Sequence, residues 1–282
     1  MIHSLIIGNN FDVEKYSLIL SKSQFFDRVD TVLVNEKGEF PSDMNDFANF
    51  DAILLVSQLE KPYQLFFDLI KDRSNFYFSN QPNLSITELT NLDQLYIESG
   101  NLIFPEFKEI NHPLIQEFIS IQSNQLLFRY NKSVSSKREI SPSLFNGLSF
   151  LSLLSPMPVK KINVNSIETT NSGRPEIKVR LKMWDSSICY IIIKIDNRNE
   201  HSILLESKNG NFNFNLAENY LENIHGTRFK SEEVTDEELL QKTVDSFAMD
   251  IILNKKPIFS FNHYLLSINI LSKIENILSN SF

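Results

Sequence analysis

The chain has 282 residues, enough for two domains of roughly 150 residues each, and its 42% hydrophobic and 22% charged residues are typical of a globular protein with a buried core. The net charge of −8 argues against a nucleic-acid partner, because neutralising phosphates requires a basic face. The single cysteine excludes an internal disulfide, no apolar run approaches the roughly 18 residues of a membrane span, and the start lacks a basic signal segment. We therefore predict a cytoplasmic protein without a membrane or nucleic-acid partner.

The first part of the chain alternates short apolar strands with helical segments, which is the pattern of βαβ units. Residues 2–7 are an apolar strand that runs into Gly8 and the polar pair Asn9 and Asn10. A buried parallel strand enters the turn before a helix in this way, and nucleotide-binding α/β domains place a phosphate there. The elements expected next are a helix at 12–26, strands at 31–34 and 51–57, a helix at 61–71, a strand at 75–79, a helix at 85–100, a strand at 102–104 and a helix at 113–123.

The second half is typical of an antiparallel sheet, because consecutive strands follow one another with short turns. The expected strands are 159–168, 176–183, 187–196, 202–207 and 211–216, and helices are expected at 236–253 and 263–278. We predict an α/β protein: a Rossmann-like, mostly parallel-sheet domain over residues 1–120, and an α+β domain with an open antiparallel sheet over residues 121–282.

Isolated reactive side chains give little indication of chemistry. Cys189 lies in an apolar run, so we interpret it as strand core rather than a reactive thiol. Trp184 is expected on the face of the second sheet, and His201 in a hairpin turn. The five histidines lack metal-ligand spacing, so no metal site is predicted. His112 is the histidine nearest the expected domain junction, and a loop role is favoured for it.

Several stretches, in a fixed order, resemble the Gfo/Idh/MocA oxidoreductase family, typified by glucose–fructose oxidoreductase and inositol dehydrogenase. Residues 51–58 read D-A-I-L-L-V-S-Q, similar to the family's D-A-V-x-V-x-T-P strand, and 75–82 stand where the family has a strand ending in Glu-Lys-Pro. Residues 100–113 resemble the strand before F-x-x-R-F-x-P, and 245–257 resemble the turn between the two closing helices. The resemblance implies NAD or NADP as cofactor and a sugar-like small molecule as substrate.

Three departures from the family pattern concern its chemistry. A dinucleotide loop needs Gly-x-Gly-x-x-Gly, but residues 8–13 read G-N-N-F-D-V, which keeps only the turning glycine and places Phe11 where a pyrophosphate would approach. The proton-handling lysine of Glu-Lys-Pro is matched by Gln81, whose amide cannot exchange a proton near neutral pH. The family's histidine–aspartate helix element matches 143–154, which has neither residue and offers only Asn146.

The candidate cofactor contacts all follow strands of the first sheet. Gly8, Asn9 and Asn10 either bind a phosphate or keep only the shape of the turn. Asn35 and Glu36 follow the second strand, where an acidic residue would hold ribose hydroxyls, although an exposed strand end needs no such role. Ser57 and Gln58 follow the strand at 51–57, and Asn80 and Gln81 follow the next strand. Together these four residues form a polar rim that could bind a ligand.

Three functional hypotheses remain open. The first is a divergent, non-catalytic or altered ligand-binding relative of these oxidoreductases that assists a partner enzyme. The second is an active NAD(P)-dependent oxidoreductase on a sugar-like substrate, with Gln81 and Asn146 positioning the substrate. The third is a purely structural subunit that dimerises through its sheet face, where Trp184 is expected.

Overall fold

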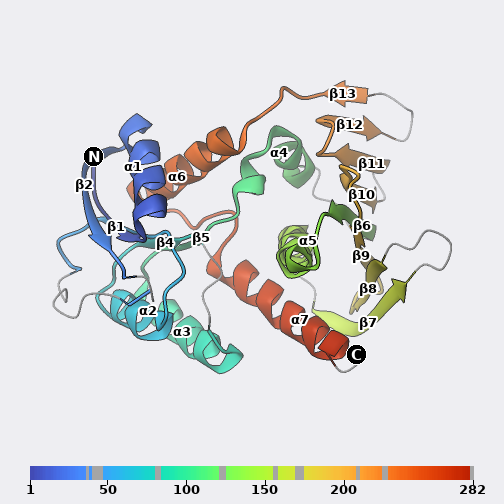
Figure 1. The fold of residues 1–282 in the computed structure, drawn as a ribbon, viewed down its shortest axis with the longest axis horizontal. Helices are drawn as coiled ribbons and strands as arrows, with labels where there is room; N and C mark the ends of the chain where they lie inside the picture. The colour runs from blue at the N-terminus through green and yellow to red at the C-terminus, as the bar shows by residue number, and fades with distance from the viewer. Residues whose placement is uncertain are drawn as a thin grey trace. The chain divides into compact units, whose positions relative to one another are not determined.

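The chain forms two compact units in a computed structural model (Figure 1), which describes residues 1–35, 38–39, 47–79, 84–120, 125–154, 158–168, 175–207, 210–223 and 228–279. Unit 1 contains Met1–Asn111 and Val234–Asn262, and unit 2 contains His112–Glu233 and His263–Phe282. The helix at 236–253, which we expected to follow the antiparallel sheet as part of one C-terminal domain, is thus part of unit 1.

Unit 1 is built on a parallel sheet with the strand order β2-β1-β3-β4-β5, which confirms the expected parallel arrangement. Its strands are β1 (Ile2–Gly8), β2 (Phe26–Leu33), β3 (Ala52–Leu55), β4 (Phe76–Phe78) and β5 (Ile103–Pro105). The chain moves from β1 to one neighbour, β2, and then returns to the other side of β1 with β3. The sheet therefore has a topological switch point at the carboxyl ends of β1 and β3, where open α/β sheets bind ligands.

Helices cover this sheet on both sides (Figure 1), with α1 and α6 on one side and α2 and α3 on the other. Their bounds are α1 (Asn10–Lys22), α2 (Pro62–Lys71), α3 (Ile86–Ser99) and α6 (Asp236–Leu253), and a short 3-10 helix, η1, spans Lys108–Asn111. The expected first helix was too long, because Ser23 is already extended and residue 26 begins β2, paired with Ile2. The helix expected at 85–100 is α3: Ser85 and Glu88 form a capping box at its start, and Gly100 ends it at φ 73°.

The core of unit 1 explains why α6 belongs to it. Leu240, Val244 and Phe247 recur every three or four residues, so they form one buried stripe along the helix. The Phe247 ring lies 5.7 Å from the ring of Tyr77 on β4 and 5.4 Å from that of Phe104 on β5. The helix therefore packs directly on the parallel sheet.

Unit 2 contains a mixed, mostly antiparallel sheet of eight strands in the order β13-β12-β11-β10-β6-β9-β8-β7. Its strands are β6 (Gln125–Val134), β7 (Val159–Glu168), β8 (Pro175–Met183), β9 (Ile188–Ile195), β10 (His201–Ser207), β11 (Gly210–Asn215), β12 (Tyr220–Asn223) and β13 (Arg228–Lys230). Strands β6, β12 and β13 were not expected from the sequence. Strands β6 and β9 pair in parallel, so the sheet is not purely antiparallel.

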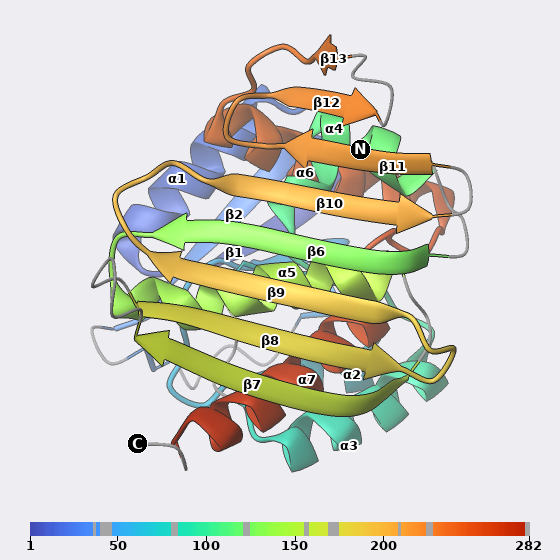
Figure 2. The same cartoon turned by 90° about the vertical axis from the view of Figure 1, so that its right-hand side faces the viewer.

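One face of this sheet is packed on α5 (Ile140–Leu154), and Figure 2 shows the opposite face without a described helix of unit 2 over it. The contact with α5 is close at Gly147, where an added Cβ would lie 2.8 Å from Cδ1 of Tyr130 and 3.1 Å from Cγ2 of Ile191. The unit's other described helices are α4 (Pro113–Ser120), α7 (Phe261–Ser279) and the 3-10 helix η2 (Lys137–Glu139). No helix among the described residues is long and apolar enough to cross a membrane.

Three single-residue expectations in unit 2 have clear outcomes. Cys189 is buried within β9 as expected, and burial raises the pKa of its thiol to about 12. Trp184 was expected on the sheet face, but it lies in the turn between β8 and β9, where its ring is 62% exposed. His201 was expected in a hairpin turn, but it begins β10, and burial lowers the pKa of its imidazole to about 3.

Candidate functional site

The switch point of the parallel sheet joins the end of β1 to the residues after β3. The backbone N–H of Asn9 donates to Oγ of Ser57 over 2.9 Å. Gly8 leaves no room for a side chain, because an added Cβ would lie 2.7 Å from both Oγ of Ser57 and Cγ2 of Val56. The structure thus places Gly8, Asn9 and Ser57 together, and it gives Gly8 a packing reason that does not require a cofactor.

The N-terminus of α1 is capped by the candidate residues themselves. Asn9 is the N-cap, and its Oδ1 accepts the backbone N–H of Asp12 over 2.9 Å. The Asp12 carboxylate in turn accepts Nδ2–H of Asn9 over 2.8 Å and Oγ–H of Ser57 over 2.5 Å. A carboxylate is favourable at a helix N-terminus, where it faces the positive end of the helix dipole. The anion at this switch point is therefore one of the protein's own side chains.

Asp12 was not expected as a site residue, although it stands in the fifth position of the loop motif. Its side chain and that of Asn9 use the hydrogen-bonding groups that a phosphate would otherwise meet. Among the described residues, the backbone N–H groups of Asn10 and Phe11 have no partner, so two donors of the first helical turn remain available. The Phe11 side chain points away from the core and is 76% exposed. The Asn10 side chain donates to Glu14 over 2.7 Å.

The other cofactor candidates are distributed as follows. Asn35 follows β2 and closes a turn with Glu39, whose backbone N–H donates to Oδ1 of Asn35 over 2.9 Å. Gly38, at φ 76°, donates its N–H to the Asn35 carbonyl over 2.8 Å, which completes this turn. Gln58 is exposed next to Ser57. Glu36, Asn80 and Gln81 lie outside the described residues, so their roles stay predictions.

Asn146, the second candidate for positioning a substrate, is half-buried on α5. It belongs to unit 2, whereas the cofactor candidates belong to unit 1. Its role in substrate binding stays a prediction.

The half-buried carboxyl group of Glu106, which was not expected as a site residue, directly follows β5. Oε2 of Glu106 accepts hydrogen bonds from the hydroxyl groups of Tyr16 on α1 and Tyr77 on β4. Burial raises the pKa of Glu106, while the two hydroxyl donors partly oppose that shift. Burial also raises the pKa values of both tyrosines, so both keep their protons. No local pattern marks this cluster, because its three members come from three elements far apart in sequence.

His112 is a structural histidine at the start of α4. Its Nδ1 accepts the backbone N–H of Leu114 over 3.2 Å, and its Nε2 lies 3.0 Å from Oδ1 of Asn219. Since Nδ1 accepts a hydrogen bond, Nε2 carries the proton and donates it to Asn219. His112 therefore fixes the start of the helix against the turn that contains Asn219, in agreement with the favoured loop role.

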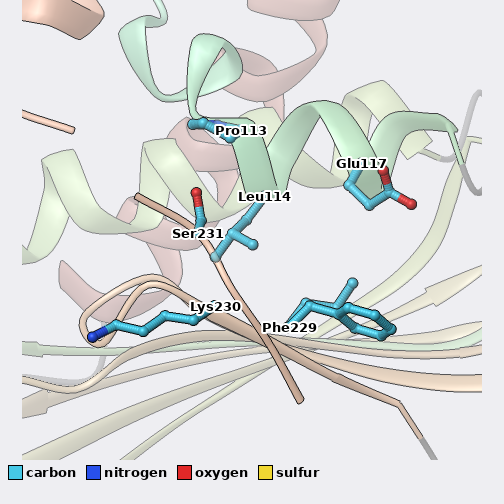
Figure 3. Close-up of a pocket in the computed structure, with 7 residues that line it drawn as sticks. Pro113, Leu114, Glu117, Phe229, Lys230 and Ser231 are labelled. Atoms are coloured by element: carbon cyan, nitrogen blue, oxygen red, sulfur yellow. The ribbon is translucent and has the colours of Figure 1, made fainter. Parts of the chain in front are cut away.

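Unit 2 has a groove of about 340 Å³ between α4 and the strand β13 (Figure 3). Its floor is apolar, with Leu114 and Leu221 buried and Phe229 56% exposed. Glu117 and Lys230 also line it. With a mainly apolar lining and no described cluster of groups with shifted pKa values, the groove has the properties of a contact surface rather than of a catalytic site.

The fold of the chain is that of solved Gfo/Idh/MocA-family oxidoreductases. An oxidoreductase from Agrobacterium radiobacter in complex with NAD+, L-tartaric acid and magnesium is similar with a TM-score of 0.79 at 8% identity, over 100% of this chain and 97% of that one. UDP-N-acetylglucosamine 3-dehydrogenase GnnA from Acidithiobacillus ferrooxidans gives 0.78 at 10% identity, over 97% and 96%. A Gfo/Idh/MocA family oxidoreductase from Vibrio cholerae gives 0.75 at 13%, over 99% and 100%. No protein-family model and no curated protein matches the sequence.

Proposed function

We propose that this chain, which has the fold of Gfo/Idh/MocA oxidoreductases, is a non-catalytic or altered ligand-binding protein that assists a partner enzyme. The observation that carries the proposal is the Asp12 carboxylate, which Ser57 and Asn9 hold at the switch point of the parallel sheet. A sugar-like small molecule remains the expected ligand class, because one of the structures with this fold is a UDP-N-acetylglucosamine 3-dehydrogenase.

The residues present do not fit the pyrophosphate of NAD or NADP well. A phosphate at the N-terminus of α1 would lie close to the Asp12 carboxylate, and two like charges at about 4 Å repel by about 4 kcal/mol at an effective dielectric constant of about 20. The helix dipole stabilises an anion there by only ~0.3–1 kcal/mol. Asn10 replaces the second glycine of the Gly-x-Gly-x-x-Gly loop, which allows the close approach of a pyrophosphate. Repulsion thus exceeds attraction at this turn.

The second candidate function is an active NAD(P)-dependent oxidoreductase on a sugar-like substrate. Two observations favour it: the backbone N–H groups of Asn10 and Phe11 remain available, and a similar structure contains NAD+. In this case a phosphate would bind these two donors and displace the Asp12 side chain. Gln81 and Asn146 would then position the substrate.

Removing the charge of Asp12 should distinguish the two functions. We expect the wild-type chain to bind NADH and NADPH no more tightly than about 1 mM, a binding free energy of only about −4 kcal/mol. Asp12→Asn keeps an oxygen acceptor for Ser57 and removes the repulsion, so it should tighten NADH binding by about tenfold, which is ~1.4 kcal/mol of the repulsion estimated above. NADH fluorescence titration measures both affinities.

Glu14→Gln is the matched control, because Glu14 carries the same charge on the same helix and contacts Asn10 rather than Ser57. It should leave the affinity unchanged. Micromolar binding of NADH or NADPH by the wild-type chain would overturn the proposal and favour the oxidoreductase. Cofactor-dependent turnover gained by Gln81→Lys would instead indicate a lost catalytic site, consistent with the proposal.

A further inference from the structure

The open face of the sheet in unit 2 is basic along β8. Lys178, Arg180 and Lys182 alternate with the buried residues Val179 and Leu181. Since successive side chains of a strand point to opposite faces, the three cations share the face away from α5. The chain as a whole has a net charge of −8, so this basic face is opposite in sign to the rest of the protein.

The strand register extends this basic region across four strands. Arg180 on β8 is opposite Tyr190 on β9, and Tyr190 is opposite Arg129 on β6. On the other side of β8, Lys182 is opposite Lys161 on β7, which places two like charges in direct cross-strand contact. Such a pair destabilises a sheet. Five cations therefore lie on one continuous area of the face.

These cations lack protein counter-charges. Among the described residues, no ion pair joins Arg129, Lys161, Lys178, Arg180 or Lys182 to a carboxylate, whereas Lys194 on the neighbouring strand pairs with Glu200 over 2.8 Å. Nε of Arg129 is buried and has no hydrogen-bond partner. A buried N–H without an acceptor costs free energy. This area of the face therefore lacks a hydrogen-bond acceptor as well as negative charge.

Two of the cations, Lys178 and Arg180, line a hollow that has an aromatic wall. Its volume is about 450 Å³, and its lining consists of Asn163, Asn165, Lys178, Arg180 and Tyr190. Nζ of Lys178 lies 5.3 Å from the centre of the Tyr190 ring, and Cζ of Arg129 lies 5.7 Å from it. The ring therefore holds two cations beside the hollow, and the two asparagines add neutral amide groups.

We propose that this hollow binds a small molecule that carries two or more phosphate groups. Guanidinium groups match phosphate geometry with paired N–H donors, which suits Arg180 in the lining, while Arg129 next to Tyr190 adds positive charge. Lys178 and the asparagine amides supply further donors. A multivalent anion also relieves the repulsion between the five cations, so it gains more here than a single charge would.

The size of the basic area favours a small molecule over a polymer. Four adjacent strands, β7, β8, β9 and β6, span about 14 Å, and the positions from Lys178 to Lys182 span about 13 Å along β8. Glu176, two positions before Lys178 on β8, and Glu206 on β10, opposite Leu127, share the same face and limit the area with negative charge. A nucleic acid requires a longer basic groove that follows its backbone.

A second copy of the chain is also disfavoured on this area. A two-fold symmetric dimer whose axis passes through this area places the patch against itself. Each of the five cations would then meet cations of the other copy. The open face is thus better suited to an anion than to the sheet-face homo-oligomer that the third hypothesis requires.

The test is calorimetric titration of the full chain with sodium tripolyphosphate, at constant ionic strength set with NaCl. We expect saturable binding of one anion per chain and a rise in melting temperature beyond that caused by NaCl. Arg180→Gln should weaken the binding at least tenfold, because it removes a charge and a paired donor. Lys71→Gln, which removes an exposed lysine of α2 in unit 1, is the control and should leave the affinity unchanged.

Misfolding would not mimic this result, because Arg180 is exposed among like charges. The unliganded Arg180→Gln variant should melt at the wild-type temperature or above it. The proposal is overturned by equal affinities of the Arg180→Gln and Lys71→Gln variants, by one anion per two chains, or by tighter binding of polyglutamate or single-stranded RNA of equal charge.

Asp12→Asn should not change tripolyphosphate affinity, which keeps this test separate from that of the dinucleotide site. NADH also carries two phosphate groups, so its titration is repeated with the Arg180→Gln variant, which then reports NADH binding at the switch point alone.

Discussion

Phe247→Ala should lower the free energy of unfolding of unit 1 by about 3–5 kcal/mol, the range for truncating a fully buried phenylalanine. The Phe247 side chain is fully buried, and its ring contacts Tyr77 and Phe104 on two strands of the parallel sheet. The substitution removes those contacts and leaves a cavity between α6 and the sheet. A loss of this size is a large fraction of the 5–15 kcal/mol that stabilises a typical domain.

Urea unfolding followed by two probes measures this effect. Far-UV circular dichroism reports both units, whereas the fluorescence of Trp184, the single tryptophan, reports unit 2. Phe229→Ala is the control, since that ring is 56% exposed and its loss should change stability by less than about 0.5 kcal/mol. A loss below 1 kcal/mol for Phe247→Ala would contradict the role of α6 as part of the core of unit 1.

The sequence predicts the parallel sheet and its helices because their signals are local. An apolar run such as that in β3 is buried on both faces, and the capping residues Ser85 and Glu88 mark a helix start by themselves. The antiparallel strands were also found, with β7 predicted at its observed bounds. These features depend on residues that are close in sequence, so the sequence alone predicts them.

Strand β6 could not be found in this way. Its end, with Asn131, Lys132 and Ser133, is polar and precedes a serine-rich stretch, so it reads as a solvated loop. In the structure it is a central strand, parallel to β9 on one side and antiparallel to β10 on the other. Only its alternate residues, such as Phe128 and Tyr130, are buried. Pairing with strands that follow much later in the chain decides its structure.

In the candidate site, too, only the features that depend on local sequence could be predicted. The sequence predicts that Gly8, Asn9 and Ser57 lie near the ends of neighbouring strands, because the strand pattern fixes their positions. It does not predict that the Asp12 carboxylate turns back onto Ser57, because that depends on the distance between the first turn of α1 and a residue 45 positions later. The same limit applies to the basic face of unit 2, where cations from three strands, β6, β7 and β8, come together only through the register.

The stability of unit 1 should fall as pH rises through the pKa of Glu106. Folding raises that pKa above its ordinary value of 4.5, so the folded chain binds the proton more tightly than the unfolded chain does. The stabilising contribution of the protonated carboxyl is therefore fully present below about pH 4.5 and is lost as pH rises through the folded pKa. Glu106→Gln keeps the acceptor oxygen and cannot ionise. It should be more stable than the wild type at about pH 8 and lose this advantage at about pH 4.

Tyr77→Phe tests the same cluster from the donor side. The ring stays in the core, but the carboxyl of Glu106 loses one of its two hydroxyl donors. We expect a loss of about 1–3 kcal/mol at about pH 8, where the carboxylate form is most dependent on its donors, and a smaller loss at about pH 4. Urea unfolding at both pH values measures the difference.

Tyr63→Phe, which removes a hydroxyl group from α2 outside this cluster, should change little at either pH. Two results would contradict the assignment of the titration to Glu106: an equal loss for Tyr77→Phe at both pH values, or a Glu106→Gln variant with the pH dependence of the wild type. In the double variant, the loss caused by Tyr77→Phe should become nearly independent of pH, because the amide of the Glu106→Gln substitution carries no charge for the hydroxyl group to stabilise. That coupling separates a direct hydrogen bond to Glu106 from a general loosening of the core around Tyr77.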